Sequence, residues 1–183
     1  MKTLTARGMS VLLAIAAGGL ILITPTGSWA QQKYKFYFKD PGGLTKYTEQ
    51  HALDVGDLPG HQIRVASLQT KFANVAPEYD GVKVVETMSW LAADYIGASG
   101  RFTQYSVLLM ANGDKIFNRS EGLAQTSIGA DGGRKTSYST VTTLTGGTGK
   151  FATIRGIIRG SGITDFKTGA NNNPSEGEYW FEK

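Results

Sequence analysis

The amino-acid sequence predicts an all-β protein folded as a closed antiparallel barrel of eight strands. Short segments rich in aromatic and β-branched residues recur along the chain, separated by turn signals that contain Gly, Asn or Asp. The 24 glycines favour a fold with many tight turns, and no segment after residue 30 has the apolar pattern of a long amphipathic helix. Closure would remove the exposed edges of the sheet, and eight strands would leave room for side chains or one small ligand.

The composition narrows the class of protein further. The chain has 183 residues, of which 40% are hydrophobic, enough for one domain with its own core. It has no cysteine, which excludes disulfides, a thiolate nucleophile and cysteine-ligated metals. The two histidines, His51 and His61, lack a third partner at metal-ligand spacing, so we expect surface or loop histidines, no metal site and no cofactor.

The first thirty residues predict a signal peptide for export. Lys2 and Arg7 precede an apolar run over residues 9–23, and Ser28-Trp29-Ala30 supplies small residues before a cleavage point at Gln31. The run is short for a membrane span of about 20 residues. We therefore expect a secreted or periplasmic protein without a stable membrane anchor after cleavage, in which residues 31–183 form a single barrel domain.

The charge of the chain argues against a nucleic-acid partner. The formal net charge is +4, but Lys2 and Arg7 belong to the predicted signal peptide, and without them it falls to +2. No dense basic stripe follows, as a nucleic-acid surface would need. An exported protein without disulfides depends on packing or oligomerisation for stability, so a homo-oligomer, a dimer or trimer, is a further expectation.

The predicted strands follow one another as a meander. Residues 44–60 are predicted to form a long loop with at most one helical turn, and residues 74–81 and 171–174 to form turns or loops. Strands are predicted over residues 34–38, 61–72, 82–87 with a continuation to 96, 101–111, 114–124, 134–145, 154–166 and 177–181.

The clearest predicted hairpin turns at Asn112-Gly113, a pair that suits the positive φ angles of a two-residue turn. Such a turn places Leu109 opposite Ile116 and Val107 opposite Asn118. One face of the hairpin would then carry a set of apolar and polar residues that could bind a ligand, namely Tyr105, Val107, Leu109, Ile116, Asn118 and Ser120. Both faces of the hairpin are mixed, which suits a barrel wall with a lined interior and an exterior partly covered by another subunit.

Three residues are candidates for catalysis. Tyr105 or Asn118 could polarise a carbonyl or hold a water if their face points inward. Glu86, inside a barrel, would have a raised pKa and could act as an acid or base. On an outward face the same side chains are ordinary surface residues. No Gly-x-Ser-x-Gly nucleophile elbow indicates a serine hydrolase.

The segment Thr145-Gly-Gly-Thr-Gly-Lys-Phe-Ala-Thr-Ile-Arg-Gly156 is rich in glycine. Phe151 stands where a phosphate loop needs Ser or Thr after its lysine. Gly156 and Gly160 exclude the long helix that a dinucleotide fingerprint needs. The segment is therefore predicted to form a tight turn, one helical turn over residues 150–153 and a returning strand.

With its G-G-T-G-K-F-x-x-x-R-G pattern, this segment resembles the one shared by plant dirigent proteins and allene oxide cyclase-like barrels. The resemblance covers about twelve residues closely and residues 100–183 loosely. It implies an eight-stranded antiparallel barrel of the calycin type with a mainly apolar cavity, often assembled as a trimer. Members steer the cyclisation or coupling of reactive small molecules or have no assigned activity, and none of their catalytic residues aligns with a residue here.

Three functions are compatible with these observations. The barrel could bind a small hydrophobic molecule without changing it, or it could be a cofactor-free isomerase or cyclase that works by folding its substrate. It could also be a structural or interaction protein filled by side chains. A cavity of a few hundred cubic ångströms would favour the first two.

Overall fold

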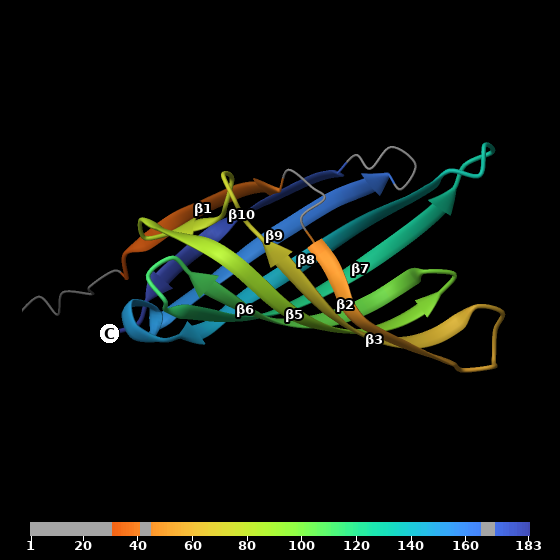
Figure 1. Ribbon diagram of the computed structural model, residues 1–183, viewed down its shortest axis with the longest axis horizontal. Coiled ribbons are helices and arrows are strands. Elements are labelled where there is room, and N and C mark those ends of the chain that lie inside the picture. Colours follow the sequence, from red (N-terminus) through yellow and green to blue (C-terminus); the bar gives the residue numbers. More distant parts are fainter. Residues whose placement is uncertain (1–30, 41–44, 166–170) are drawn as a thin grey trace, which may run out of the picture. The chain divides into compact units, whose positions relative to one another are not determined.

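A computed structural model describes residues 31–40, 45–165 and 171–183 (Figure 1). The predicted signal peptide lies outside these residues. The described elements are β1 (Lys33–Asp40), β2 (Thr45–Asp54), β3 (His61–Lys71), β4 (Glu78–Tyr79), β5 (Val82–Ile96), β6 (Ser99–Met110), β7 (Lys115–Ile128), β8 (Arg134–Gly147), the 3-10 turn η1 (Gly149–Phe151), β9 (Ile154–Asp165) and β10 (Asn171–Phe181).

The strands form one antiparallel sheet in the order β1-β10-β9-β8-β7-β6-β5-β3-β2, with the short β4 paired to β5. The all-β antiparallel class is therefore confirmed. The closed eight-stranded barrel is wrong, because the sheet has ten strands and its path runs from β1 at one edge to β2 at the other. Strand directions alternate along this path, so the two edge strands point the same way. A parallel pair needs a connection of about a dozen residues or more, and only residues 41–44 separate β1 from β2.

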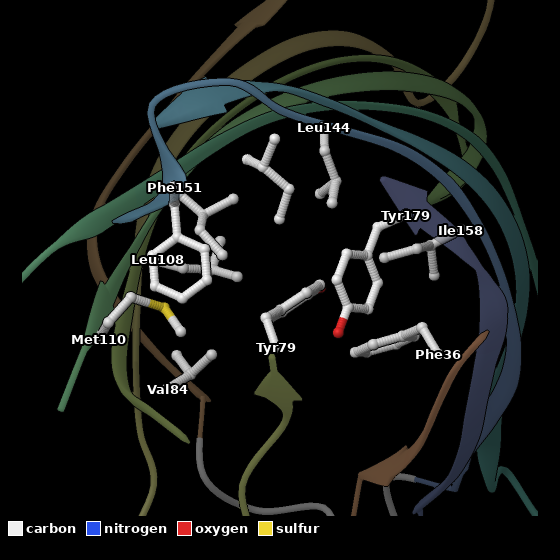
Figure 2. Close-up of a cluster of buried hydrophobic side chains, with 11 residues drawn as sticks. Phe36, Tyr79, Val84, Leu108, Met110, Leu144, Phe151, Ile158 and Tyr179 are labelled. Atoms are coloured by element: carbon white, nitrogen blue, oxygen red, sulfur yellow. The ribbon is translucent and has the colours of Figure 1, made fainter. Parts of the chain in front are cut away.

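The same short connection forces the sheet to curl. Nine strands at a spacing of about 4.8 Å would make a flat sheet about 38 Å wide. Asp40 and Thr45, at opposite edges, are only five residue steps apart, which spans at most about 18 Å of extended chain. The sheet therefore wraps around a concave inner face, and Figure 2 shows this curve from the inside.

Most of the predicted strands are confirmed, over residues 34–38, 61–71, 82–96, 101–110, 115–124, 134–145 and 154–165; residue 166 lies outside the described residues. The glycine-rich segment also forms the predicted turn, since η1 separates β8 from β9 and buries Phe151 completely. The last strand is longer than predicted. It begins at Asn171, and Pro174 lies where the ladder with β9 is interrupted, a place where the missing N–H does no harm.

The long loop predicted over residues 44–60 is wrong for most of its length, because β2 occupies Thr45–Asp54. Every residue of β2 is exposed, so its sequence shows no apolar alternation to mark it as a strand. Hydrogen bonds to β3 hold it in place, with a register shift between Tyr47 and Glu49.

The apolar core fills one part of the concave face. Side chains from β1, β5–β10 and η1 converge there on Tyr79, which β4 carries into the curve of the sheet (Figure 2). The Tyr79 ring stacks on Phe36 at 4.9 Å between centroids and meets Tyr179 edge-on at 5.4 Å. It thus packs against β1 and β10, next to the edge that has no strand partner.

The turn after Tyr79 is fixed to the same strands. Asp80 and Gly81 both have positive φ, as a two-residue hairpin turn requires. The Asp80 N–H donates to Tyr179 Oη at 2.8 Å, and Lys150 Nζ lies 2.9 Å from Asp80 Oδ2. These contacts connect β4, β10 and η1, so the apolar end of the curled sheet is held by side chains.

We predict that Tyr79→Ala lowers the free energy of unfolding by about 3 kcal/mol or more, the usual cost of deleting a buried aromatic ring. The matched control is Tyr37→Ala on β1, where the side chain is 68% exposed and the change should stay within about 0.5 kcal/mol. Urea denaturation followed by circular dichroism measures both. Equal losses in the two variants would contradict the role given to Tyr79.

Candidate functional site

The β6–β7 hairpin has a different register from the predicted one. Leu108 lies opposite Ile116, Ser106 opposite Asn118 and Gln104 opposite Ser120. The two strands are joined by residues 111–114, and Met110 N–H donates to the Asp114 carbonyl at 2.9 Å. Of the central residues only Gly113 has positive φ, whereas the predicted turn needs two.

This shift of one residue separates the six predicted ligand-binding residues, because side chains alternate between the faces of a strand. Three of them, Ile116, Asn118 and Ser120, lie on the concave inner face. The other three, Tyr105, Val107 and Leu109, lie on the outer face, where Tyr105 is 56% exposed. The prediction that all six share a face is therefore wrong, and their role as ligand contacts stays a prediction.

Of the three catalytic candidates, only Asn118 faces inward. Glu86 pairs with Leu109 after a bulge in β5, which places it on the outer face. Its Oε1 accepts a hydrogen bond from Gln69 Nε2 at 2.6 Å. The prediction that Glu86 is a carboxylate inside a barrel is therefore wrong, because its side chain lies on the outer face.

Next to the apolar core, the concave face forms a cavity of about 780 Å³ that is open to solvent on one side. Its lining comes from both edges of the sheet and from the strands between them. The wall combines aromatic and aliphatic side chains with amides, hydroxyls and one guanidinium; it includes Tyr47, Gln62, Arg64, Leu68, Leu91, Tyr95, Phe102, Gln104, Ser120, Tyr138, Thr140 and Thr142.

A belt of small polar side chains separates this cavity from the core. Along β6 the inner face changes from Leu108 to Ser106 to Gln104, and β7 changes likewise from Ile116 through Asn118. The belt is held by hydrogen bonds between neighbouring strands. Ser89 and Ser106 hydroxyls are 2.9 Å apart, and those of Ser120 and Thr142 are 2.8 Å apart.

Asn118 is the exception within this belt. The residue is only 9% exposed, and its Oδ1 accepts no hydrogen bond from any described residue. A buried carbonyl oxygen without a donor costs about 1–3 kcal/mol. Asn118 therefore holds an unpaired acceptor buried within the belt. Ser120, the next residue on the same strand face, lines the cavity, whereas Asn118 is not part of its lining.

The cavity also contains a positioned cation. Arg64 on β3 donates from Nε and Nη2 to Gln62 Oε1, at 2.9 and 2.6 Å. Gln62 in turn donates from Nε2 to Asp54 Oδ1 at 2.8 Å. The guanidinium carbon lies 5.8 Å from the centre of the Tyr95 ring. An amide on one side and an aromatic face on the other thus fix the direction of the side chain.

Two tyrosines of the lining are held in their protonated form. Burial raises the pKa of Tyr95, and Tyr47 raises it further, while Arg64 acts in the opposite direction. Burial also raises the pKa of Tyr138, and the carboxylate of Asp40 adds to that effect. Both phenols are therefore neutral and can donate a hydrogen bond within the cavity.

Several of these lining residues were missed from the sequence. The segment 61–72 was correctly predicted as a strand, but its apolar residues Ile63 and Val65 are exposed on the outer face, and Gln62 and Arg64 point inward. On β6 and β8 as well, polar residues occupy the alternate positions that point inward. Which of the two alternating sets of a strand lines the interior can be recognised only once the registers between strands are known.

Of the two histidines, His51 is part of the cavity lining and His61 is not. His51 Nε2 is 2.9 Å from Glu49 on the exposed strand β2. The His61 imidazole, 15% exposed, lies between two carboxylates, with Nδ1 bonded to Asp57 and Nε2 to Asp94 at 2.8 Å. Hydrogen bonds to Asp57 and then to Asp94 raise the pKa of His61, and the bond to His61 lowers the pKa of Asp57.

The chain matches no protein-family model and no curated protein. The resemblance of residues 145–156 to dirigent and allene oxide cyclase-like proteins therefore stays an expectation. Over the described ranges no helix has the length and apolarity needed to span a bilayer. Among the described residues, no group of three or more His, Cys, Asp or Glu side chains has an arrangement that could hold a metal ion.

The His61 cluster predicts a pH dependence of stability. Because the pKa of His61 is raised on folding, its contribution is fully present below the unfolded pKa of 6.5 and is lost as the pH rises through the folded pKa. The free energy of unfolding should therefore fall as the pH rises above 6.5 and through the folded pKa of His61. This fall should be smaller in His61→Gln and unchanged in His51→Gln. Urea titrations across that range test this, and an unchanged slope in His61→Gln would contradict it.

Proposed function

We propose that this protein is exported and binds a small, mainly apolar molecule in the cavity on the inner face of its curled sheet. The observation that carries the proposal is the cavity itself, about 780 Å³ in volume and lined by apolar side chains together with a few polar ones, Arg64, Gln62 and Ser120 among them. Cavities that hold small molecules have volumes of about 300–1,000 Å³ and combine apolar walls with a few placed polar groups.

The wall chemistry supports an apolar body for the ligand. Leu68, Leu91 and Phe102 offer apolar surface, and each ligand CH₂ buried against such surface contributes about 0.8 kcal/mol. The amides, hydroxyls and phenols around them would fix the ligand's orientation. A structural barrel filled by side chains, the third hypothesis, would leave no such space.

A cofactor-free isomerase or cyclase is the second candidate function. It is favoured by the protonated phenols of Tyr95 and Tyr138, which could donate to a carbonyl or epoxide oxygen of a bound substrate. The resemblance of residues 145–156 to barrels that steer cyclisation points the same way. In that case the cavity would act chiefly by holding the substrate in one conformation.

A homo-oligomer also stays a prediction. Its support is the outer face, where Met88, Trp90 and Tyr105 are each about half exposed on neighbouring strands. Trp90 lies directly opposite Tyr105 in the β5–β6 ladder. A second copy covering these side chains would bury apolar surface that water now meets.

The proposed function is tested by filling the cavity. Ala66 lines it, and Ala92, which lies opposite Val65 in the β3–β5 ladder, is exposed on the outer face. We expect Ala66→Trp to abolish binding of the neutral fluorescent probe N-phenyl-1-naphthylamine, because the indole would occupy the ligand's space. Ala92→Trp, the matched control, should bind it like the wild type.

Fluorescence titration gives the dissociation constants, and mass spectrometry of small molecules that co-purify from the protein's own host identifies the ligand. Loss of binding in Ala92→Trp with normal binding in Ala66→Trp would move the site to the outer face. The proposed function would be rejected if the wild type neither binds the probe nor carries any co-purified molecule.

Asn118 gives a test of the polar belt beside the cavity. Asn118→Leu replaces a buried, unpartnered amide by an apolar group of similar size, which should leave the free energy of unfolding unchanged or raise it by about 1 kcal/mol. Calorimetry measures this change, and a clearly destabilised variant would contradict the account of Asn118 as an unpartnered amide.

A further inference from the structure

We infer that the molecule bound in this cavity carries an oxyanionic group, a carboxylate or sulfonate, on an apolar body, and that Arg64 binds this group. The inference rests on the proposed function, since it names the ligand class for the same cavity. It depends on three features of Arg64: its unused donors, the lack of an acidic partner and the surface beside it.

The guanidinium has donors left over. Of its five N–H groups, two are used by the bonds from Nε and Nη2 to Gln62 Oε1. No other described residue accepts a hydrogen bond from Arg64. The Nη1 group and the second hydrogen of Nη2 therefore remain as an adjacent pair of donors, which is the edge that binds a carboxylate through two parallel hydrogen bonds.

Arg64 is also without an acidic partner. No carboxylate of the described residues forms an ion pair with it. Asp54 is held one amide away, by Gln62, and the cavity's other carboxylate, Asp40, acts on Tyr138. A partly buried cation without a counter-ion pays for its lost hydration unless an anion joins it. A bound oxyanion would supply that charge.

The surroundings of Arg64 fix where the rest of the ligand would lie. Tyr95 covers one face of the guanidinium at 5.8 Å, and Leu91 and Phe102 line the same cavity. The two hydrogen bonds to Gln62, on the same strand, fix the orientation of the guanidinium before a ligand binds. An anion at the free edge would place its apolar body against the aromatic and aliphatic wall.

The experiment compares two probes that differ by one anionic group. N-phenyl-1-naphthylamine is neutral, and its 8-sulfonate carries the same rings with one negative charge. Both are titrated by fluorescence against the purified protein produced from the full chain, in wild type, Arg64→Gln and Arg119→Gln. Arg119 is the matched control, because it lies on the outer face beside Tyr105 and pairs with Glu121 at 2.8 Å.

We expect Arg64→Gln to weaken binding of the sulfonate about tenfold or more, the effect of losing hydrogen bonds to a charged group. Binding of the neutral probe should change by less than about threefold, and Arg119→Gln should change neither. If Arg64→Gln does not fold, Arg64→Lys keeps the charge and loses the fork; it should then weaken the sulfonate selectively, by about threefold or more.

The outcomes separate this inference from the proposed function. If the wild type binds the neutral probe but not the sulfonate, or if Arg64→Gln weakens both probes equally or neither, the anionic ligand class is overturned and the cavity remains a binding site. If the wild type binds neither probe and carries no co-purified molecule, the proposed function fails, and the inference fails with it.

Discussion

The architecture depends on one geometric constraint: the chain passes from one edge of the sheet to the other within five residues. Asp40 ends β1 and Thr45 begins β2, yet eight ladders separate these strands within the sheet. A sheet that meets this condition must curl, because a flat one would be too wide. Curling gives the sheet a concave inner face and a convex outer face. The space at the inner face is partly shielded from water.

The inner face has an apolar part and a polar part. Its core end is apolar and closed by Tyr79, whereas its other end is lined by polar and aromatic side chains around a cavity. The shape of the cavity depends on small residues in the wall. A Cβ atom at Gly122 would lie 2.3 Å from the Phe102 ring, so the ring can lie against β7 only because position 122 is glycine. Phe102 thereby becomes part of the cavity lining.

Much of the fold could be predicted from the sequence, and the reasons for the failures are physical. The strands that became β3 and β5–β9 have enough β-branched and aromatic residues to be recognised. β2 could not be recognised in this way, because a strand exposed over its whole length buries no apolar face. Backbone and side-chain hydrogen bonds to β3 hold it in place.

The candidate site was less accessible to prediction than the fold. Asn118 and Ser120 were assigned to the face that does line the interior, but they were joined to Tyr105 by an assumed two-residue turn. The turn at Asn112-Gly113 has three residues, 111–113, because the Met110 N–H donates to the Asp114 carbonyl. This one extra residue shifts the pairing by one and moves Tyr105 to the outer face. Arg64 was not among the predicted site residues. The segment 61–72 was predicted only as a strand, and the inward direction of Arg64 follows from the registers between strands.

The placement of polar groups on the inner face is the strongest reason to look for a ligand. Sheet formation itself requires only backbone pairing, and apolar residues at positions 64 and 118 would fill the interior without unpaired donors or acceptors. A partly buried guanidinium without an acid and a buried amide oxygen without a donor are unfavourable when considered alone. Both side chains lie on the concave face, but only Arg64 lines the cavity. An anionic molecule bound there would supply the charge that the guanidinium lacks. The Asn118 amide is buried in the belt between the cavity and the core, so its cost falls on the stability of the fold.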